Sequence, residues 1–322
     1  MSLLDRIQPI LLIASIGIGL GLAHLLPHLA AALLPIVTIG VFLVIYFIML
    51  GIHLRGVLQA FVRWKIIALA IGINFVFTPI LAWLLGYLFL QYDPDIWVGL
   101  ILYLVTPCIG WYLVFTELAK GDVELGISLL AWNLVLQIVL MPVYMKLLAG
   151  TIVKVDFVGI LRSVLLFLLL PLILSVATRQ VLRWRSIAFQ TVASRIRLPY
   201  LKTATLMVVI VAMFASQGRI LLSNPAVVIK MIVPGLVFFA VAFGLALLAG
   251  RLFNLSYPET ALLVFTITAR NSEASLAVAV TAFTSPLVAL TVVIGPSIEL
   301  PVLILILRAV LWLGKKKALG RA

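Results

Sequence analysis

The sequence is poor in charged residues and contains a single cysteine, Cys108. Asp, Glu, Lys and Arg make up only 10% of its 322 residues, whereas 65% are hydrophobic and the mean hydropathy is +1.31. A soluble domain could not cover its surface with so few polar side chains. The single cysteine excludes an internal disulfide. The scarcity of charge therefore indicates an integral membrane protein.

Motifs of membrane-embedded enzymes are also missing. The three histidines, His24, His28 and His53, lie near the ends of apolar runs, and no paired-histidine metal spacing or G-x-S-x-G motif occurs inside those runs. We therefore expect neither an enzyme nor a bound cofactor. The N-terminal segment lacks a basic stretch followed by a small-residue cleavage site, so we expect it to remain as the first membrane span.

The apolar runs have the length of membrane-spanning helices. About 20 mainly apolar residues cross a bilayer as a helix, and short connections join the runs of this chain. The runs cover residues 9–28, 33–54, 65–90, 96–119, 123–149, 157–182, 200–222, 226–253, 258–284 and 287–313. The sequence therefore predicts an all-α integral membrane protein with about ten transmembrane helices and no inserted soluble domain.

Basic residues are distributed unequally between the two sides of the predicted membrane. Most of the 23 lysines and arginines fall in connections on the same side as the N-terminus, including the cluster at 179–202 and the C-terminal Lys315, Lys316 and Lys317. Because cytoplasmic loops carry the excess of these residues, we predict that both termini are cytoplasmic and that the protein lies in the cell membrane. The net charge of +13 thus reflects orientation in a lipid bilayer and not nucleic-acid binding.

The ten spans divide into two similar sets of five. The fourth span is interrupted by T-P-C-I-G (106–110), and the ninth is interrupted by A-R-N-S-E (269–273). Because five spans per copy place the second copy upside down, we predict inverted repeats over residues 1–150 and 151–322. Inverted repeats with broken helices at the membrane midplane are typical of secondary transporters.

The two breaks are expected to cross at the midplane and to bring Cys108 close to Asn271. Pro107 and Gly110 leave backbone groups of the fourth span without helical partners. Such groups are tolerated at this depth only inside protein or beside a water-filled cavity.

Two ionisable residues, Arg270 and Glu273, lie in the middle of the ninth span. Each costs roughly 2.5–3.5 kcal/mol at the bilayer centre, so such residues usually serve a function, although a structural ion pair between helices is the alternative. A carboxyl group buried at this depth favours its neutral form and can exchange a proton near neutral pH. Glu273 therefore has the properties of a proton carrier.

Four segments carry a resemblance to a known family. They are C-I-G-W-Y-L-V-F-T-E-L-A-K-G-D (108–122), N-L-V-L-Q (133–137), R-N-S-E-A-S-L-A-V-A-V (270–280) and G-P-S-I-E-L-P-V (295–302). With the ten-span layout, they resemble the arsenite efflux permeases of the arsenical resistance-3 family, which belong to the superfamily of the bile acid:sodium symporters. The resemblance implies export of arsenite, with antimonite as a further candidate, and the properties of Glu273 predict that the export is in exchange for protons.

The resemblance also implies roles for particular residues. The cysteine and the glutamate that the family requires match Cys108 and Glu273, and the family's other polar positions match Asn133, Gln137, Asn271 and Glu299. The family usually has an arginine before the cysteine, where this chain has Pro107, and an asparagine where this chain has Arg270. The positive charge has thus moved to the other broken helix, and the site keeps its cation if the two breaks touch.

The chemistry of trivalent arsenic agrees with this set of residues. Arsenic(III) is a soft centre that prefers sulfur ligands, so Cys108 is expected to bind it as transported substrate and not as a resident metal. Amides such as those of Asn133, Gln137 and Asn271 suit the hydroxyl groups of arsenite, and Arg270 is a further candidate for substrate binding. Alternatively, Cys108 is only a small buried apolar residue.

Three questions stay open at the level of sequence. Glu299, between Pro296 and Pro301, is either a second titrating group or a cap for the broken backbone. A sodium- or proton-coupled organic-anion symporter of the same superfamily is an alternative function, although the positions of both sodium sites carry unsuitable residues here. A passive channel for small solutes is the other alternative. The sequence does not indicate an oligomeric state.

Overall fold

A computed structural model describes residues 3–26, 33–51, 63–109, 111–152, 158, 161–162, 165–185, 189–223 and 225–319. The elements in these ranges are all helical. In chain order they are α1 (Leu3–Leu25), α3 (Leu34–Gly51), α4 (Trp64–Gly72), η2 (Ile73–Phe77), α5 (Thr78–Phe89), α6 (Pro94–Leu104), α7 (Trp111–Leu118), α8 (Val123–Leu147), η3 (Ala149–Thr151), η4 (Leu165–Leu169), α10 (Leu170–Trp184), α11 (Phe189–Arg195), α12 (Leu198–Ser223), α13 (Pro225–Leu252), α14 (Tyr257–Thr268), α15 (Ser272–Ala282) and α16 (Pro286–Leu319). This content confirms the predicted all-α fold.

Long apolar helices account for much of the described chain. Four of its helical segments are long and apolar enough to cross a membrane, namely Trp64–Phe89, Val123–Thr151, Pro225–Leu252 and Pro286–Gly314. Shorter apolar helices cover Pro94–Leu104 and Thr203–Ser216. The protein is therefore a multi-pass membrane protein. The predicted sixth span, 157–182, lies partly outside the described residues.

The helices pack in two groups. The first group contains α1, α3, α10 and α12, which contact one another side by side, and the second contains α4 to α8 and α13 to α16. Each group takes spans from both halves of the chain: the first holds spans 1, 2, 6 and 7, and the second holds spans 3, 4, 5, 8, 9 and 10. The repeat boundaries at 1–150 and 151–322 stay a prediction.

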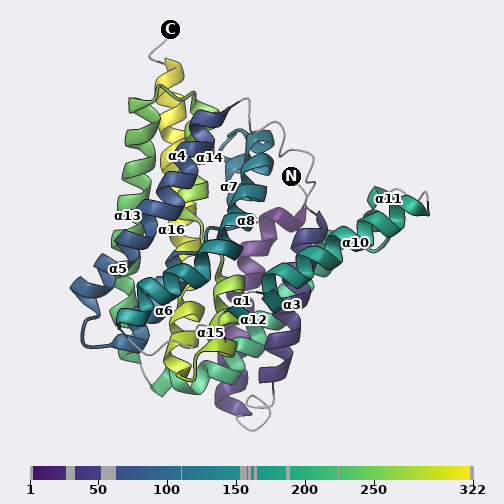
Figure 1. Ribbon diagram of the computed structural model, residues 1–322, viewed down its shortest axis with the longest axis vertical. Helices are drawn as coiled ribbons and strands as arrows, with labels where there is room; N and C mark the ends of the chain where they lie inside the picture. The colour runs from purple at the N-terminus through teal and green to yellow at the C-terminus, as the bar shows by residue number, and fades with distance from the viewer. Residues whose placement is uncertain are drawn as a thin grey trace.

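Two spans are broken at half their length. Figure 1 shows α7 and α14 in the upper half of the molecule and α6 and α15 in the lower half, so both breaks lie near mid-height. The fourth and ninth spans are therefore each two half-helices. This arrangement confirms that helices 4 and 9 are broken.

Local sequence signals set the outer ends of these half-helices. Pro94 is the first residue of α6, and Ser256 forms a capping box with Glu259 at the start of α14. Asp122 caps α8 by accepting a hydrogen bond from the Leu125 amide, and Arg63 contacts the same carboxylate at 2.5 Å. These caps hold the outer ends of the helices, so the irregular backbone between half-helices is confined to the breaks.

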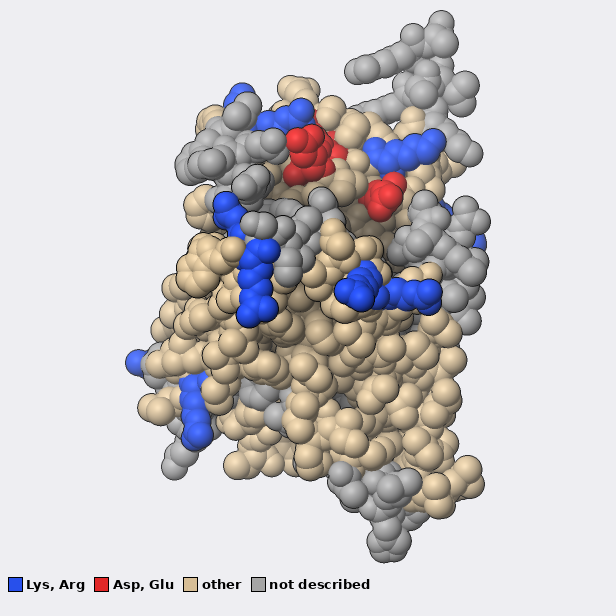
Figure 2. All heavy atoms as spheres, turned by 90° about the vertical axis from the view of Figure 1, so that its right-hand side faces the viewer, with Lys and Arg blue, Asp and Glu red and all other residues tan. Residues whose placement is uncertain are grey.

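On the face of the molecule drawn in Figure 2, charged side chains are gathered toward one end. In Figure 2 most of the lysine, arginine and acidic side chains lie in the upper half, and the surface below is mainly uncharged. Large apolar side chains are exposed along the helices, for example Val76, Ile80 and Leu305. An exposed apolar band of this kind is expected where lipid surrounds a protein.

Candidate functional site

The two broken spans meet through their backbones. Pro107 and Arg270 face each other as an antiparallel bridge. The amide of Cys108 donates to the carbonyl oxygen of Ala269 at 3.1 Å, and the amide of Asn271 donates to that of Thr106 at 2.8 Å. The bonds across the bridge use backbone groups that the breaks leave without helical partners. The predicted crossing of the two breaks is confirmed. Cys108 pairs with Ala269 and Asn271 pairs with Thr106, so Cys108 and Asn271 lie on opposite sides of the Pro107–Arg270 bridge.

Hydroxyl groups support the end of α6 at this crossing. The Thr106 hydroxyl donates to the Tyr103 carbonyl at 2.9 Å, and the Ser275 hydroxyl donates to the Leu102 carbonyl at 2.9 Å. The two hydroxyl oxygens lie 2.5 Å apart, and both side chains are fully buried. The last carbonyls of a helix have no partner within it, so these hydroxyls replace water at a depth where water is scarce.

Arg270 is buried between the two spans. Its Nη1 donates to the Leu104 carbonyl at 2.9 Å, and its Nη2 donates to Asn74 Oδ1 at 3.0 Å and also to the Ile267 carbonyl. The guanidinium carbon lies 5.1 Å from the centre of the Phe238 ring. Arg270 thus bonds the carboxyl ends of α6 and α14.

Arg270 and Glu273 do not lie on one continuous helix. Arg270 and Glu273 would lie one helical turn apart only if the break were helical. Instead, Arg270 is in the bridge, Asn271 caps the next helix by accepting from the Ala274 amide at 3.1 Å, and α15 begins at Ser272. The side chain of Glu273 lies outside the part of the chain that the structure describes.

Glu299, which lies on α16, contacts the broken backbone of the ninth span. Its Oε1 accepts a hydrogen bond from the Arg270 amide at 2.9 Å, and its Oε2 accepts one from the Tyr103 hydroxyl. The carboxyl group therefore makes the backbone contact that the capping alternative requires. Its proton exchange stays a prediction.

Cys108 lies at the start of α7. Its side chain is 2% exposed, and its Sγ accepts a hydrogen bond from the Trp111 amide at 3.1 Å. Trp111 is the first residue of α7, so the sulfur faces the positive end of that half-helix, where negative charge is favoured. The neighbouring Gly110 lies outside the described residues.

Buried amides on α8 continue the polar region. Asn133 Nδ2 donates to the Thr266 hydroxyl at 3.3 Å, which joins α8 to α14. Asn133 Oδ1, both amide atoms of Gln137 and Asn271 Nδ2 are buried without a hydrogen-bond partner among the described residues. Buried polar atoms are usually paired, so these atoms are free to bind a small polar solute or water.

Asn74 belongs to this region, although its sequence context favours a satisfied amide beside the kink at Thr78-Pro79. The residue lies in η2, a π-helical turn, and such turns often occur at functional sites. Its Nδ2 donates to the Thr266 carbonyl at 3.1 Å while its Oδ1 accepts from Arg270. The amide is therefore satisfied, as expected, but the partner arginine was not identified from the sequence.

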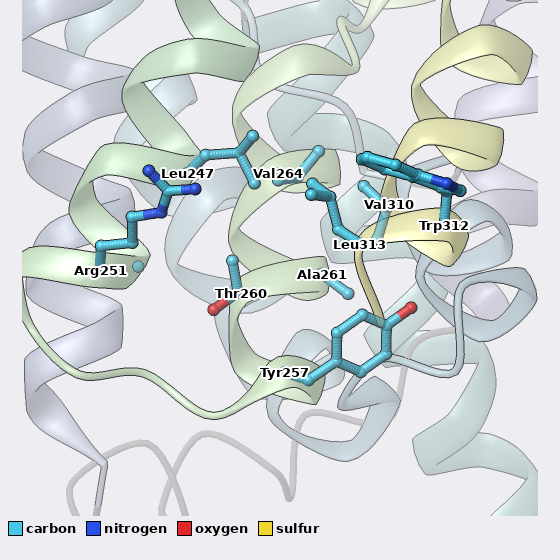
Figure 3. A pocket seen from close by; sticks show the side chains of 10 residues that line it. Leu247, Arg251, Tyr257, Thr260, Ala261, Val264, Val310, Trp312 and Leu313 are labelled. Carbon is cyan, nitrogen blue, oxygen red and sulfur yellow. The ribbon is translucent and has the colours of Figure 1, made fainter. Parts of the chain in front are cut away.

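A cavity of about 470 Å³ lies away from the crossing. Figure 3 shows side chains from α13, α14 and α16 around it, including Arg251, Tyr257 and Trp312. It follows α14 only from Tyr257 to Val264, whereas the buried polar residues lie at the opposite end of that helix. We therefore take the crossing, and not this cavity, as the candidate site.

Known proteins similar to this chain include transport proteins. The model of the sodium bile acid symporter family matches residues 38–224. The arsenical-resistance protein Acr3 of Corynebacterium glutamicum is 28% identical over 98% of this chain and 91% of its own length. The Acr3 protein of Alkaliphilus metalliredigens is 24% identical over 94% of this chain and 91% of its own length. The uncharacterised protein YbaS of Bacillus subtilis is 29% identical over 70% of this chain and 72% of its own length. The chain belongs to the sodium bile acid symporter family of membrane transporters.

Proposed function

We propose that this protein exports arsenite from the cytoplasm across the cell membrane in exchange for protons. The observation that carries the proposal is the crossing, where the segments that hold the lone cysteine and the buried Arg270 and Asn271 bond to each other through their backbones. Similarity to two arsenical-resistance proteins over nearly the whole chain supports the choice of substrate. Antimonite, which also has a soft trivalent centre, is proposed as a second substrate.

Substrate binding is assigned to one sulfur atom and several amides. Cys108 supplies the soft ligand, and the unpaired atoms of Asn133, Gln137 and Asn271 supply hydrogen bonds to the hydroxyl groups of neutral arsenite. Arg270 contributes through Nε, because Nε has no partner among the described residues. One sulfur ligand binds arsenic more weakly than several would, which suits a transporter that must release its substrate.

Proton coupling is assigned to Glu273, with Glu299 as a second titrating group. Glu273 follows the crossing on α15, and Glu299 contacts the crossing from α16. A carboxyl group that takes up a proton from outside and releases it inside can drive export of a neutral solute. Both termini are proposed to be cytoplasmic, because most lysines and arginines fall in connections on the same side as the N-terminus.

A sodium-coupled organic-anion symporter is the second candidate, because the family to which the chain belongs includes such proteins by name. Arg270 would then attract the anion. Its two terminal nitrogens, however, already donate to protein oxygens, which favours the neutral substrate.

Uptake of arsenite by inside-out membrane vesicles tests these functions against one another. Export in the cell corresponds to uptake here, so we expect an acidic vesicle lumen to drive arsenite accumulation without sodium. A protonophore should abolish the accumulation. Uptake that stops at equal concentrations would indicate a channel, and a requirement for sodium would indicate the symporter.

A further inference from the structure

We propose that Arg270 is a built-in replacement for a free metal cation. Backbone carbonyls at the ends of two helices form a cation-binding site at the crossing, and the guanidinium occupies this site. Removal of the side chain makes the site available to Na⁺. The inference goes beyond the proposed function, and its test does not use arsenite. A negative result for one proposal therefore does not decide the other.

The carboxyl ends of two half-helices converge on this guanidinium. Leu104 is the last residue of α6, and Ile267 is in the last turn of α14. Each helix carries the equivalent of about half a negative charge at its carboxyl end. The carbonyls of both residues accept hydrogen bonds from Arg270, so one positive side chain compensates two negative helix ends.

An amide oxygen joins the two carbonyls around the guanidinium, and a carboxylate lies at the backbone amide of the same residue. Asn74 Oδ1 accepts from Nη2 at 3.0 Å, and the Glu299 carboxylate accepts from the Arg270 backbone amide at 2.9 Å. Backbone carbonyls, amide oxygens and carboxylates are the ligands that hard cations prefer. In transporters with broken helices, the carboxyl ends of half-helices and unwound carbonyls commonly coordinate Na⁺.

The same contacts keep a free cation out of the unmodified protein. Arg270 is 1% exposed, and its guanidinium lies against the Phe238 ring at 5.1 Å. The oxygens of Leu104, Ile267 and Asn74 already accept hydrogen bonds from it. A second positive charge would have to displace these bonds and would be repelled at close range. The protein is therefore expected to be indifferent to sodium.

Thermal unfolding of purified protein tests the inference, with NaCl compared against choline chloride at equal concentration. The unmodified protein should have the same melting temperature in both salts. Arg270→Ala and Arg270→Gln should melt lower in choline chloride, and NaCl should raise their melting temperatures along a saturable curve, as expected for binding to the folded state. Arg270→Lys should remain indifferent to sodium, because it keeps a cation at this position.

Arg179 offers a matched control. Its Nε and Nη2 donate to the Leu50 carbonyl at 3.1 and 2.6 Å, and its Nη2 also donates to the Met49 carbonyl at 2.7 Å. These carbonyls belong to the end of one helix, α3, without a second helix end. Arg179→Ala should lose stability equally in both salts.

Several outcomes would decide against the proposal. One is a saturable rise in the melting temperature of the unmodified protein with NaCl. Another is that Arg270→Ala and Arg270→Gln, the two neutral variants, fold and have the same melting temperature in both salts. If neither neutral variant folds while Arg270→Lys does, the need for a cation is supported. If Arg270→Lys also fails to fold, a positive charge alone is insufficient and the proposal is rejected.

Discussion

The Cys108 thiol has a local structural contact that a serine can reproduce. Its Sγ accepts a hydrogen bond from the Trp111 amide at the start of α7. A hydroxyl oxygen can accept the same bond but has little affinity for a soft trivalent arsenic centre. The role of this residue in folding can therefore be separated from its role in transport.

We expect Cys108→Ser to lose arsenite uptake down to the level of membranes that lack the protein. Its melting temperature should change by no more than about 3 °C, the shift that corresponds to roughly 1 kcal/mol in a chain of this size. Vesicle uptake and thermal unfolding measure the two effects. Full uptake by the variant would show that the sulfur only fills space.

The Glu273 carboxyl group can be tested as the proton carrier by replacing it with an amide. Glu273→Gln copies the shape of the protonated acid but cannot release a proton. We expect the variant to keep substrate-protected labelling of Cys108 by a thiol reagent and to lose accumulation driven by an acidic lumen. Glu124→Gln, at an exposed position in the first turn of α8, is the control and should accumulate arsenite normally. Undiminished accumulation by Glu273→Gln would remove this residue from the coupling step.

At the scale of elements, the crossing depends on hydroxyl groups as well as on the breaks themselves. Thr106 and Ser275 come from different spans, yet both bond the carbonyls at the end of α6. Leaving a buried carbonyl unpaired costs about 1–3 kcal/mol. The end of α6 is therefore sensitive to residues far away in the sequence.

We expect Thr106→Val and Ser275→Ala each to lower stability by about 1–3 kcal/mol. Because the two hydroxyls lie 2.5 Å apart and both contact the Leu102 and Asn271 carbonyls, the double variant should lose less than the sum. Melting temperatures of the three variants provide the comparison. Thr205→Val removes an exposed hydroxyl that bonds its own helix, and it should have little effect. Strict additivity would mean that the two hydroxyls act independently.

The sequence predicted the breaks better than it predicted their partners. Pro107 cannot continue helical hydrogen bonding, and a charged residue stands out within an apolar run, so both interruptions were visible by residue type. The contacts of Arg270 with Asn74 and Leu104 were not visible, because periodicity within one span says nothing about which other span it faces. The start of α15 at Ser272 was not predicted either, because residue spacing within an interrupted span does not show where the second half-helix begins.

At the scale of the whole molecule, the helices form two groups that each combine spans from both halves. In transporters built from repeats, access alternates between the two sides when one group of helices rocks against the other around a fixed site. Hydropathy predicts how many spans there are and where they lie, but not how they group. The grouping had to come from the structure.

Orientation can be tested with the lone cysteine removed. In a Cys108→Ser background, Tyr92→Cys lies in the connection between α5 and α6, where the side chain is 88% exposed, and Arg251→Cys lies at the exposed end of α13. We expect a membrane-impermeant thiol reagent to label the first in intact cells and the second only after the cells are opened. The reverse pattern would place both termini outside.

The backbone pairing of Pro107 with Arg270 has a mechanical consequence. Two hydrogen bonds fasten the broken spans to each other at their midpoints, so one span cannot slide along the other without separating both. The crossing therefore acts as a fixed pivot between the two spans. Relative displacement of the spans should be smallest at the crossing and largest at their outer ends. The distance between probes attached at the outer ends of α6 and α14 should change during the transport cycle. The distance between probes at residues 107 and 270 should not.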